Sequence, residues 1–268
     1  MIAFASNSLL CRASLTQTSI DAATFTFVRI FSGAAALWLI IKMRRTAWKE
    51  AGNWFSAAAL FVYAAAFSFA YNTLSAGTGA LLLFGAVQAT MILWGFRKGE
   101  RLHAIQIVGL VMAVTGLVVL LLPGLSAPSL SGSILMLGAG VAWGIYSLRG
   151  KGEKNPASAT AGNFLRAVPF AAIVSAMLFP WARLDRTGID YAVISGAITS
   201  GLGYVIWYSA LPGLKAAGAA TVQLSVPVLA ATGGIILLSE PITFRYFVAS
   251  IAVLGGIALV LIEKNSAR

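Results

Sequence analysis

The sequence predicts an all-α integral membrane protein with ten transmembrane helices, arranged as two inverted five-helix repeats. Three observations predict this fold class. Of 268 residues, 59% are hydrophobic and 10% are charged, whereas soluble globular proteins have about 45–50% and about 25%. Apolar runs recur along the chain, and the chain partly repeats itself. Ten spans leave about 70 residues for loops and tails, which excludes a soluble catalytic domain.

The apolar runs end at charged residues or at Gly, Pro and Asn, and most are close to the roughly 20 residues that a bilayer-spanning helix needs. None shows the alternating pattern of a barrel strand, so we expect helices. In chain order the predicted spans are Met1–Leu15, Ala22–Ile41, Trp54–Tyr71, Gly77–Phe96, Leu102–Leu122, Gly132–Leu148, Ser158–Phe179, Tyr191–Leu211, Ala217–Leu238 and Thr243–Ile262.

The basic residues predict the orientation of these spans. With ten spans both termini lie on one side, and the tail and loops of that side hold most of the Lys and Arg residues: Lys42, Arg44, Arg45, Lys49, Arg97, Lys98, Arg101, Arg149, Lys151, Lys154, Lys215, Lys264 and Arg268. The other side holds Arg12, Arg183, Arg186 and Arg245. By the positive-inside rule, both termini are cytoplasmic. Because the basic residues are dispersed among short loops, membrane topology explains the net charge of +11, and no nucleic-acid partner is implied.

An internal repeat divides the chain into residues 1–130 and 131–268. At an offset of 137 positions the matching pairs are Arg12 with Arg149, Phe27 with Phe164, Arg29 with Arg166, Phe67 with Tyr204, and Tyr71 with Tyr208. Past Gly213 the offset becomes 140, which pairs Glu100 with Glu240 and Gly116 with Gly256. Because each half has five spans, the halves have opposite orientations. Inverted repeats are typical of transporters, whose substrate site lies where the halves meet.

The first span is short compared with its repeat. The sixth span begins near Gly132, and the equivalent position in the first half would precede Met1. Either the first helix is truncated or the natural start lies upstream, and we favour the second explanation.

These features together resemble the drug/metabolite transporter superfamily, specifically its EamA-type members, over essentially the whole chain. The residues that carry the resemblance are Val141-Ala142-Trp143-Gly144, Phe27-Val28-Arg29, Phe164-Leu165-Arg166, Ser225-Val226-Pro227 and Leu238-Ser239-Glu240-Pro241-Ile242-Thr243. The resemblance implies a carrier in the cytoplasmic (inner) membrane of a bacterium, commonly an exporter of amino acids or other small metabolites, with a central cavity formed by both halves.

The two halves differ at two places where the cavity is expected. The sixth span has Trp143-Gly144, but the first has Ser6-Asn7. The ninth span has Pro227, but the fourth has Val87 followed by Gln88. The identity of the substrate is therefore not inferred from that of a relative.

Arg29 and Arg166 lie about two turns inside their spans, where a charge is costly unless it faces the protein interior or a wet cavity. Their pairing by the repeat suggests a shared role. One interpretation is structural, with each arginine bonding carbonyls of a neighbouring helix or reaching toward the membrane surface. The other is direct contact with substrate. We favour the structural role, because a residue common to both halves serves the fold that they share.

Acidic residues lie outside the predicted core. All eight are in loops or at helix ends: Asp21, Glu50, Glu100, Glu153, Asp185, Asp190, Glu240 and Glu263. Proton-coupled exchange of a cation generally needs a core carboxylate, so a neutral or zwitterionic substrate is favoured. For Glu100 and Glu240 we expect hydrogen bonds to exposed amides near the next helix start, and favour this structural role over gating.

Polar and aromatic residues within the spans are the candidates for substrate binding. An amide in lipid must find a partner, so such side chains face inward, although contact with another helix is a common alternative. We single out Trp143 and Tyr204, followed by Asn7, Gln88, Tyr146, Gln223, Ser225, Tyr71 and Tyr208; Tyr63 and Trp207 are also of this type. Phe67 with Tyr71, and Tyr204 with Tyr208, would form two facing aromatic strips, for which packing or an interfacial belt is the alternative explanation.

Two helix features complete the prediction. Pro227 lacks an amide hydrogen and would interrupt the ninth span, as a hinge or a simple kink. Gly140 and Gly144 form a small-residue face on which another helix can pack closely.

The leading hypothesis is therefore a secondary carrier working by alternating access on a small-molecule substrate, as a monomer or homodimer, with no cofactor and no metal. A proton-coupled drug or cation exporter is the alternative. An intramembrane enzyme is disfavoured because the single histidine, His103, lies at a span end, far from any core carboxylate. The composition is equally compatible with a channel or a noncatalytic membrane scaffold. Saturable flux of a solute would distinguish a carrier from both.

Overall fold

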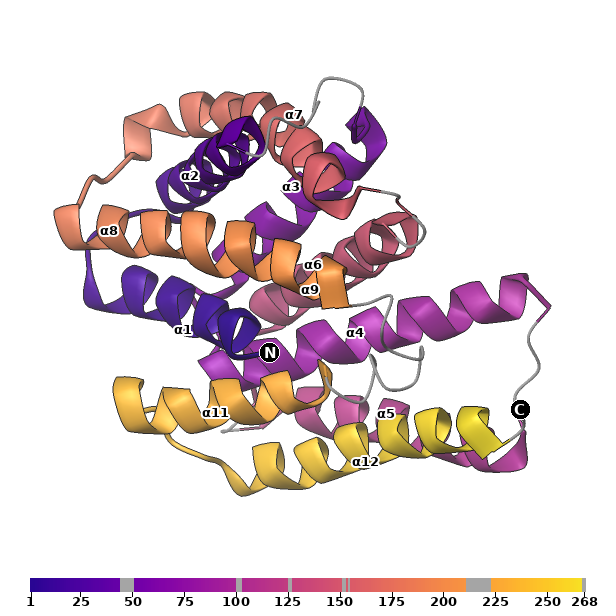
Figure 1. The fold of residues 1–268 in the computed structure, drawn as a ribbon. Coiled ribbons are helices and arrows are strands. Elements are labelled where there is room, and N and C mark those ends of the chain that lie inside the picture. Colours follow the sequence, from indigo (N-terminus) through magenta and orange to yellow (C-terminus); the bar gives the residue numbers. More distant parts are fainter. Residues whose placement is uncertain are drawn as a thin grey trace.

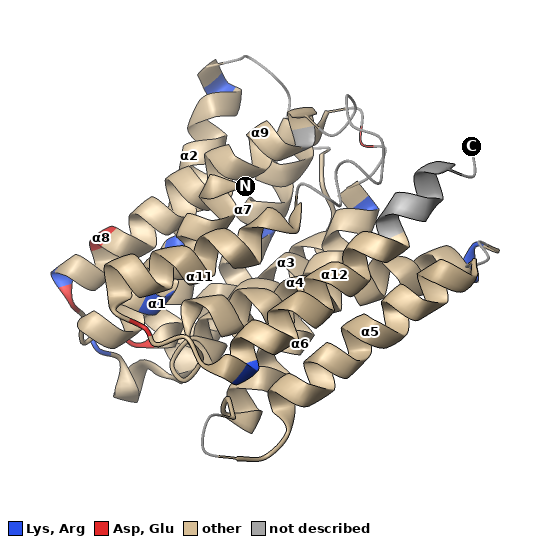
Figure 2. Ribbon diagram, turned by 90° about the horizontal axis from the view of Figure 1, so that it is seen from below, with Lys and Arg blue, Asp and Glu red and all other residues tan. Residues whose placement is uncertain are grey.

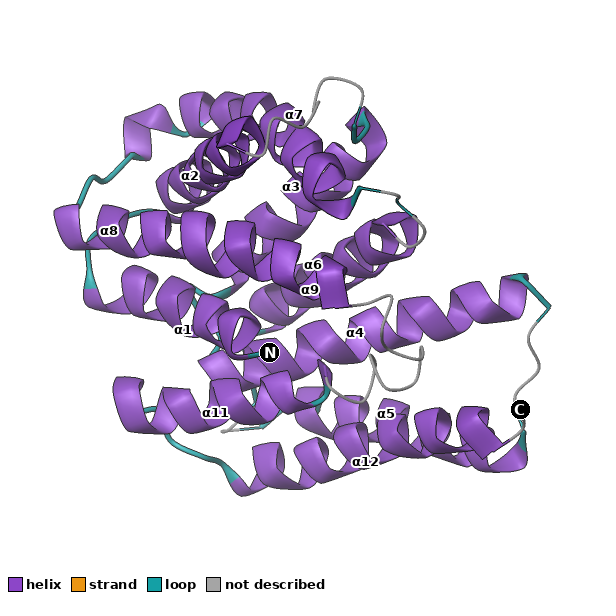
Figure 3. Cartoon of the chain, in the orientation of Figure 1, coloured by secondary structure: helices purple, strands orange, loops and turns teal. Residues whose placement is uncertain are grey.

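The computed structural model describes residues 1–43, 51–99, 103–124, 127–150, 153, 155–210 and 223–266, with side chains described except at position 208 and from position 261 onward. The regular structure in these ranges is helical, as Figure 3 shows. Ten helices follow one another in these ranges, so the predicted all-α fold is confirmed.

The first five helices are α1 (Ile2–Gln17), α2 (Ala22–Met43), α3 (Trp54–Ala70), α4 (Ala76–Arg97) and α5 (Ala104–Leu121). The next two are α6 (Leu130–Gly150) and α7 (Pro156–Met177), followed by a short turn, η1 (Phe179–Trp181). The eighth helix is continuous through three segments, α8 (Arg186–Ile194), the π-helical η2 (Ser195–Leu202) and α9 (Gly203–Ala210). The last two are α11 (Ser225–Leu238) and α12 (Phe244–Ser266).

Short polar side chains set several of the helix starts, because they satisfy amides that have no partner within the first turn. The capping side chains and the amides that they accept from are Asn53 with Ser56, Ser75 with Thr78, Asn155 with Ser158, and Asp185 with Gly188. The cap at Asp185 explains why the eighth helix begins at Arg186, five residues before the predicted Tyr191. The charged Arg186 and Asp190 lie on its exposed first turns and do not end it.

Asp21 connects the start of α2 to the loop before α8. Its carboxylate accepts hydrogen bonds from the amides of Ala23, Thr24 and Arg183, each at 2.9 Å. Partial burial alone would raise the pKa of this carboxyl, but these hydrogen bonds and one from the Thr24 hydroxyl lower it below its usual value. Two loops far apart in the sequence are thereby joined at one end of the bundle.

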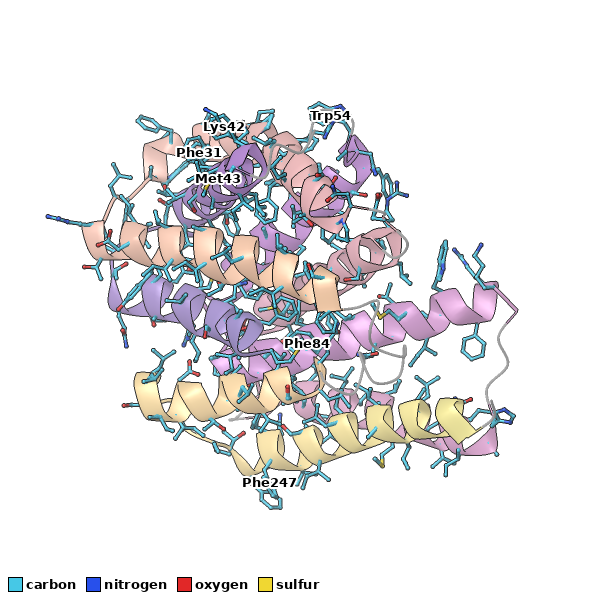
Figure 4. The ribbon with its side chains drawn as sticks, viewed as in Figure 1. Phe31, Lys42, Met43, Trp54, Phe84 and Phe247 are labelled. Carbon is cyan, nitrogen blue, oxygen red and sulfur yellow. The ribbon has the colours of Figure 1, made fainter. Side chains whose placement is uncertain are left out.

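The outer surface of the bundle is apolar. Phe31, Trp54 and Phe247 are more than half exposed, and Figure 4 shows Phe247 pointing away from the helices, whereas Phe84 is buried. Most charged residues lie in loops and at helix ends (Figure 2). Six described helices are long and apolar enough to cross a bilayer, and further apolar helices are shorter. This surface is typical of helices surrounded by lipid.

The helices of the two halves interleave. α5 and α12 form a pair at the edge of the bundle and pack mainly against each other (Figure 1). In the remaining bundle, α2 packs on α7, α4 on α11, and α6 fits against α3 and α4. In the same way α1, the counterpart of α6, fits against η2 and α11. The centre of the molecule is therefore lined by helices from both halves.

Small residues allow α6 to approach α4 closely, as predicted for the Gly140 and Gly144 face. A methyl group on Gly140 would lie 2.5 Å from the carbonyl oxygen of Leu83, and one on Gly144 would lie 2.8 Å from Cβ of Thr90. Both neighbours belong to α4, so these glycines are required by the close approach of two helices.

We expect Gly140→Ala to destabilise the fold and Gly138→Ala, two residues away on the same helix, to leave it unchanged. The added methyl at Gly140 meets backbone of α4, and overpacking of this kind costs about 1–3 kcal/mol. At Gly138 the same methyl has no neighbour within 4 Å. Thermal melting of both purified variants in one detergent measures the difference, and equal melting temperatures would contradict the packing described.

Candidate functional site

A cluster of polar and aromatic side chains occupies the interior where the two halves meet. We call it the central cluster and define it as Phe4, Asn7, Arg29, Tyr63, Phe67, Trp143, Ser195, Thr199, Ser200 and Tyr204. Its members come from α1, α2, α3, α6, η2 and α9. Each of them is at most 9% exposed. Three of the predicted substrate-binding residues, Asn7, Trp143 and Tyr204, thus lie in one place.

The hydroxyl of Tyr63 is the common hydrogen-bond acceptor of the cluster. It accepts from Nη2 of Arg29 at 3.2 Å and from the side-chain amide of Asn7 at 3.4 Å. The hydroxyl of Tyr204 also approaches it, at 3.5 Å. Helices α1, α2, α3 and α9 therefore converge on a single oxygen atom.

The π-helical segment η2 supplies the remaining polar contacts. Ser195 donates to Oδ1 of Asn7 at 2.5 Å. The Thr199 hydroxyl lies 3.3 Å from the same atom and donates to the carbonyl oxygen of Ser195 at 2.8 Å. Ser200 accepts from Nε of Arg29 at 3.3 Å. The wider turn of a π-helix changes which residues share a face, and such segments are frequent at functional sites. Here it turns residues 195, 199 and 200 toward the cluster.

Trp143 is the centre of the aromatic part of the cluster. Its ring centroid lies 4.8 Å from those of both Tyr63 and Tyr204, 5.5 Å from that of Tyr146 and 6.0 Å from that of Phe4. Phe4 also contacts Tyr204 edge-on at 5.7 Å. Rings in these orientations attract one another beyond the area that they bury, and their faces suit an apolar or flat group.

Arg29 is the charged member of the cluster, and its side chain is only 2% exposed. Its guanidinium carbon lies 4.9 Å from the ring centroid of Phe67 and 5.4 Å from that of Tyr63, where cation–π attraction is significant. Two of its nitrogens have hydroxyl partners, but Nη1 has none in the described part of the chain. The charge is therefore stabilised by hydroxyls and rings instead of a carboxylate.

Arg166, the repeat counterpart of Arg29, has a different environment. It is partly buried and donates from Nη1 to the carbonyl oxygens of Ala51 at 2.8 Å and Gly162 at 3.0 Å. Such bonds to backbone carbonyls are what the structural role predicted for this arginine requires. These contacts of Arg166 differ from the hydroxyl and ring contacts of Arg29, and a shared role for the two arginines stays a prediction.

Glu240 joins three chain segments at the end of the bundle that carries the α1–α2, α3–α4 and α11–α12 loops. Its carboxylate pairs with Nε of Arg12 at 2.9 Å and accepts from the amide of Ala76 at 2.8 Å. Arg12 also donates to the carbonyl oxygen of Tyr71 at 2.8 Å. The amide that Glu240 bonds is at a helix start, as expected, but that helix is α4 and not the following one. We call this contact the Arg12–Glu240 pair.

Tyr71 and Tyr146 are buried, and each contacts one ring of the central cluster. The Tyr71 hydroxyl donates to the carbonyl oxygen of Ala76 at 3.3 Å and its ring packs on Phe67, so it secures the α3–α4 turn and is not part of an interfacial belt. Tyr146 contacts Trp143 and lines a small hollow with Arg149.

The other predicted residues are more scattered. Gln88 and Gln223 are buried, as expected of amides, and Nε2 of the first and Oε1 of the second lack partners among the described residues. Ser225 is exposed at the first residue of α11, contrary to an inward-facing position. Pro227 is buried in the first turn of α11, where a missing amide hydrogen is tolerated. The side chain of Tyr208 and the whole of Glu100 lie outside the described residues.

Sequence reasoning did not single out Ser195, Thr199 and Ser200. Small hydroxyl residues are common in membrane helices, where they usually bond their own backbone. The available signal is a pair of Ser-Gly dipeptides five residues apart, at 195–196 and 200–201, a spacing that suits a π-helical turn.

A hollow lies beside the Arg12–Glu240 pair. It has a volume of about 180 Å³ and is lined by residues that include Thr78, Ala231, Glu240 and Tyr246. No group of His, Cys, Asp and Glu in the described ranges could hold a metal ion.

Comparisons with known proteins agree with this architecture. The model of the EamA-like transporter family matches residues 130–262. A protein of Pseudomonas aeruginosa, named as uncharacterized, is 57% identical over 265 residues, which are 98% of this chain and 92% of that protein. The threonine/homoserine exporter RhtA of Salmonella typhimurium is 32% identical over 161 residues, 57% of this chain and 53% of its own length. A crystal structure with 16% sequence identity has the same fold, with a TM-score of 0.70 over 98% of this chain and 95% of that one.

We expect Glu240→Ala to lower the free energy of unfolding by about 1–3 kcal/mol, because it leaves partly buried Arg12 and the Ala76 amide without their acceptor. Arg12→Ala should cost a similar amount, and the double variant less than the sum of the two. Asp190→Ala, at an exposed acid of α8, is the control and should have little effect. Unfolding in detergent measures all four variants, and strictly additive losses would show that Arg12 and Glu240 are not coupled.

Proposed function

The chain belongs to the EamA-like transporter family, and from this premise we propose that it is a secondary carrier of small neutral or zwitterionic metabolites such as amino acids. Transport proceeds by alternating access, in which the halves expose a central site first to one side of the membrane and then to the other. The proposed direction is export, in keeping with the name of the relative RhtA.

The observation that carries this proposal is the central cluster itself. Asn7, Trp143 and Tyr204 come from different helices of the two halves and are all at most 3% exposed. Buried polar groups inside a membrane bundle are costly and are retained where function needs them. A cluster with rings on one side and hydrogen-bonding groups on the other suits a small solute with an apolar part and a polar part.

The charges of the cluster argue against carboxylate-coupled cation exchange. Among the described residues, the acidic side chains lie at loops or helix ends, and none belongs to the cluster. A cation would also meet the positive charge of Arg29. Facilitated diffusion or exchange of a neutral or zwitterionic solute is consistent with this arrangement.

We further propose that residues 1–130 and 131–268 are the two moving repeats. The Arg12–Glu240 pair ties α1 of the first repeat to the loop after α11 of the second. An opening at that end must separate these two side chains, so the pair holds that end closed. Because the cluster is complete within one chain, either a monomer or a homodimer would provide a full site.

We expect purified protein in proteoliposomes to catalyse saturable flux of labelled amino acids, including threonine and homoserine, that is indifferent to a pH gradient. Trp143→Ala should weaken the apparent affinity at least tenfold, equivalent to about 1.4 kcal/mol, because it removes the central ring. Trp181→Ala, at a tryptophan that is 70% exposed, is the matched control and should behave as the wild type.

Three results would contradict this proposal. Gradient-driven flux of a cation would favour the drug or cation exporter, and unsaturable flux would favour a channel. Flux that is equally affected by Trp143→Ala and Trp181→Ala would place the substrate elsewhere. Trp143→Phe keeps a ring of smaller size, and distinguishes loss of binding from loss of folding if the alanine variant is unstable.

We propose that the chain lies in a bacterial inner membrane with both termini in the cytoplasm, because most Lys and Arg residues belong to the loops and tail on that side. A fluorescent reporter fused after Arg268 should therefore fluoresce, and an alkaline phosphatase fused there should be inactive. Phosphatase inserted in the loop between η1 and α8 should be active. The reverse pattern would overturn this orientation.

A further inference from the structure

Hydrogen-bond donors outnumber acceptors in the central cluster. A phenol oxygen has two lone pairs, yet the Tyr63 hydroxyl is approached by donors from Arg29, Asn7 and Tyr204. Oδ1 of Asn7 already accepts from the Ser195 hydroxyl at 2.5 Å. The Nη1 group of Arg29 carries two N–H donors and has no partner among the described residues. The cluster therefore lacks a strong acceptor.

The cluster also carries an uncompensated positive charge. The ion pair found in the described structure joins Arg12 to Glu240, and no described carboxylate bonds Arg29. An isolated buried cation costs several kcal/mol unless it is paired. Arg166, at the equivalent position of the second half, donates to two backbone carbonyls.

We propose that Arg29 binds the carboxylate of the transported solute, so that the substrate class extends from zwitterionic amino acids to other small monocarboxylates with an apolar part. This inference rests on the proposed carrier function and names its substrate class. A carboxylate accepts hydrogen bonds only and matches the planar guanidinium in both charge and shape. It would supply the acceptor and the negative charge that the cluster lacks.

The hydrogen-bonding groups of the central cluster include no dedicated partner for an amino group. Among the side-chain acceptors of the cluster, the oxygens of Asn7, Tyr63 and Ser200 already accept from donors within it. The Ser195 and Thr199 hydroxyls are themselves donors, and neither carries a negative charge. The faces of Trp143 and Tyr204 adjoin this polar part and would receive the apolar portion of the solute. The carboxylate is therefore required for binding, and an α-amino group is not.

The test uses the full chain and three forms of leucine and of phenylalanine: the free acid, the N-acetyl acid and the primary amide. Competition for flux in proteoliposomes and the rise in melting temperature in detergent measure binding independently. We expect both acids to compete and to stabilise the protein. The amides should bind at least about tenfold more weakly, since they lose a charge-assisted hydrogen bond.

Variants assign this selectivity to one residue. Arg29→Gln should weaken acid binding at least about tenfold and reduce the acid-to-amide preference to near one. Arg29→Lys keeps the positive charge but not the paired donors of a guanidinium, so it should retain part of that preference. This variant replaces Arg29→Gln in the test if the glutamine variant does not fold. Arg166→Gln is the matched control at the repeat-related arginine and should leave the preference unchanged, even if it lowers stability.

Other outcomes separate this inference from the carrier proposal. If amides bind and move as well as acids, or if the preference survives Arg29→Gln, Arg29 does not bind the carboxylate while the carrier stands. If the N-acetyl acids fail where the free acids succeed, the amino group is required and the monocarboxylate class is wrong. If no form is bound or moved, both the carrier of such solutes and the role of Arg29 are overturned.

Discussion

The hydrogen bonds that surround Arg29 are the interaction on which the centre of the molecule depends. A guanidinium that is 2% exposed in a bundle with an apolar outer surface must be stabilised by other helices, because lipid offers no partner. Tyr63 of α3 and Ser200 of η2 provide the hydroxyls, and Phe67 provides a ring face. This requirement brings α2, α3 and the eighth helix together, and the remaining cluster residues pack around them.

The two halves share an architecture but differ at the centre. Arg29 and Arg166 occupy equivalent positions, yet one meets hydroxyls and rings while the other meets carbonyls. The counterpart of Trp143 is Ser6, so the first half lacks the central ring of the second. The counterpart of Asn7 is Gly144, which lets α4 approach α6. Divergence at repeat-related positions has produced an asymmetric site within a symmetric arrangement of helices.

The fold follows from sequence because its causes are local or periodic, whereas part of the site depends on contacts between distant segments. The apolar runs predict the number of helices. A charged residue inside a predicted span marks Arg29 as inward-facing, even when its neighbours are unknown. Ser195 and Ser200 face the cluster because η2 is π-helical, and a residue pattern read with 3.6 residues per turn does not show this. Gly196 lies against the backbone of Arg29, a close approach that only the assembled bundle reveals.

Several bonds of the cluster cross from one half to the other, and this links binding to motion. Arg29 bonds Ser200, Asn7 bonds Ser195, and Tyr204 approaches Tyr63. If the halves separate at the cluster, these contacts are lost together, at a net cost of about 0.5–1.5 kcal/mol each. A solute that offers acceptors to the released donors recovers part of that cost, whereas a solute without acceptors leaves buried donors unpaired. The same hydrogen bonds that hold the empty cluster closed would then select which solutes allow it to open, because only a matching solute replaces them.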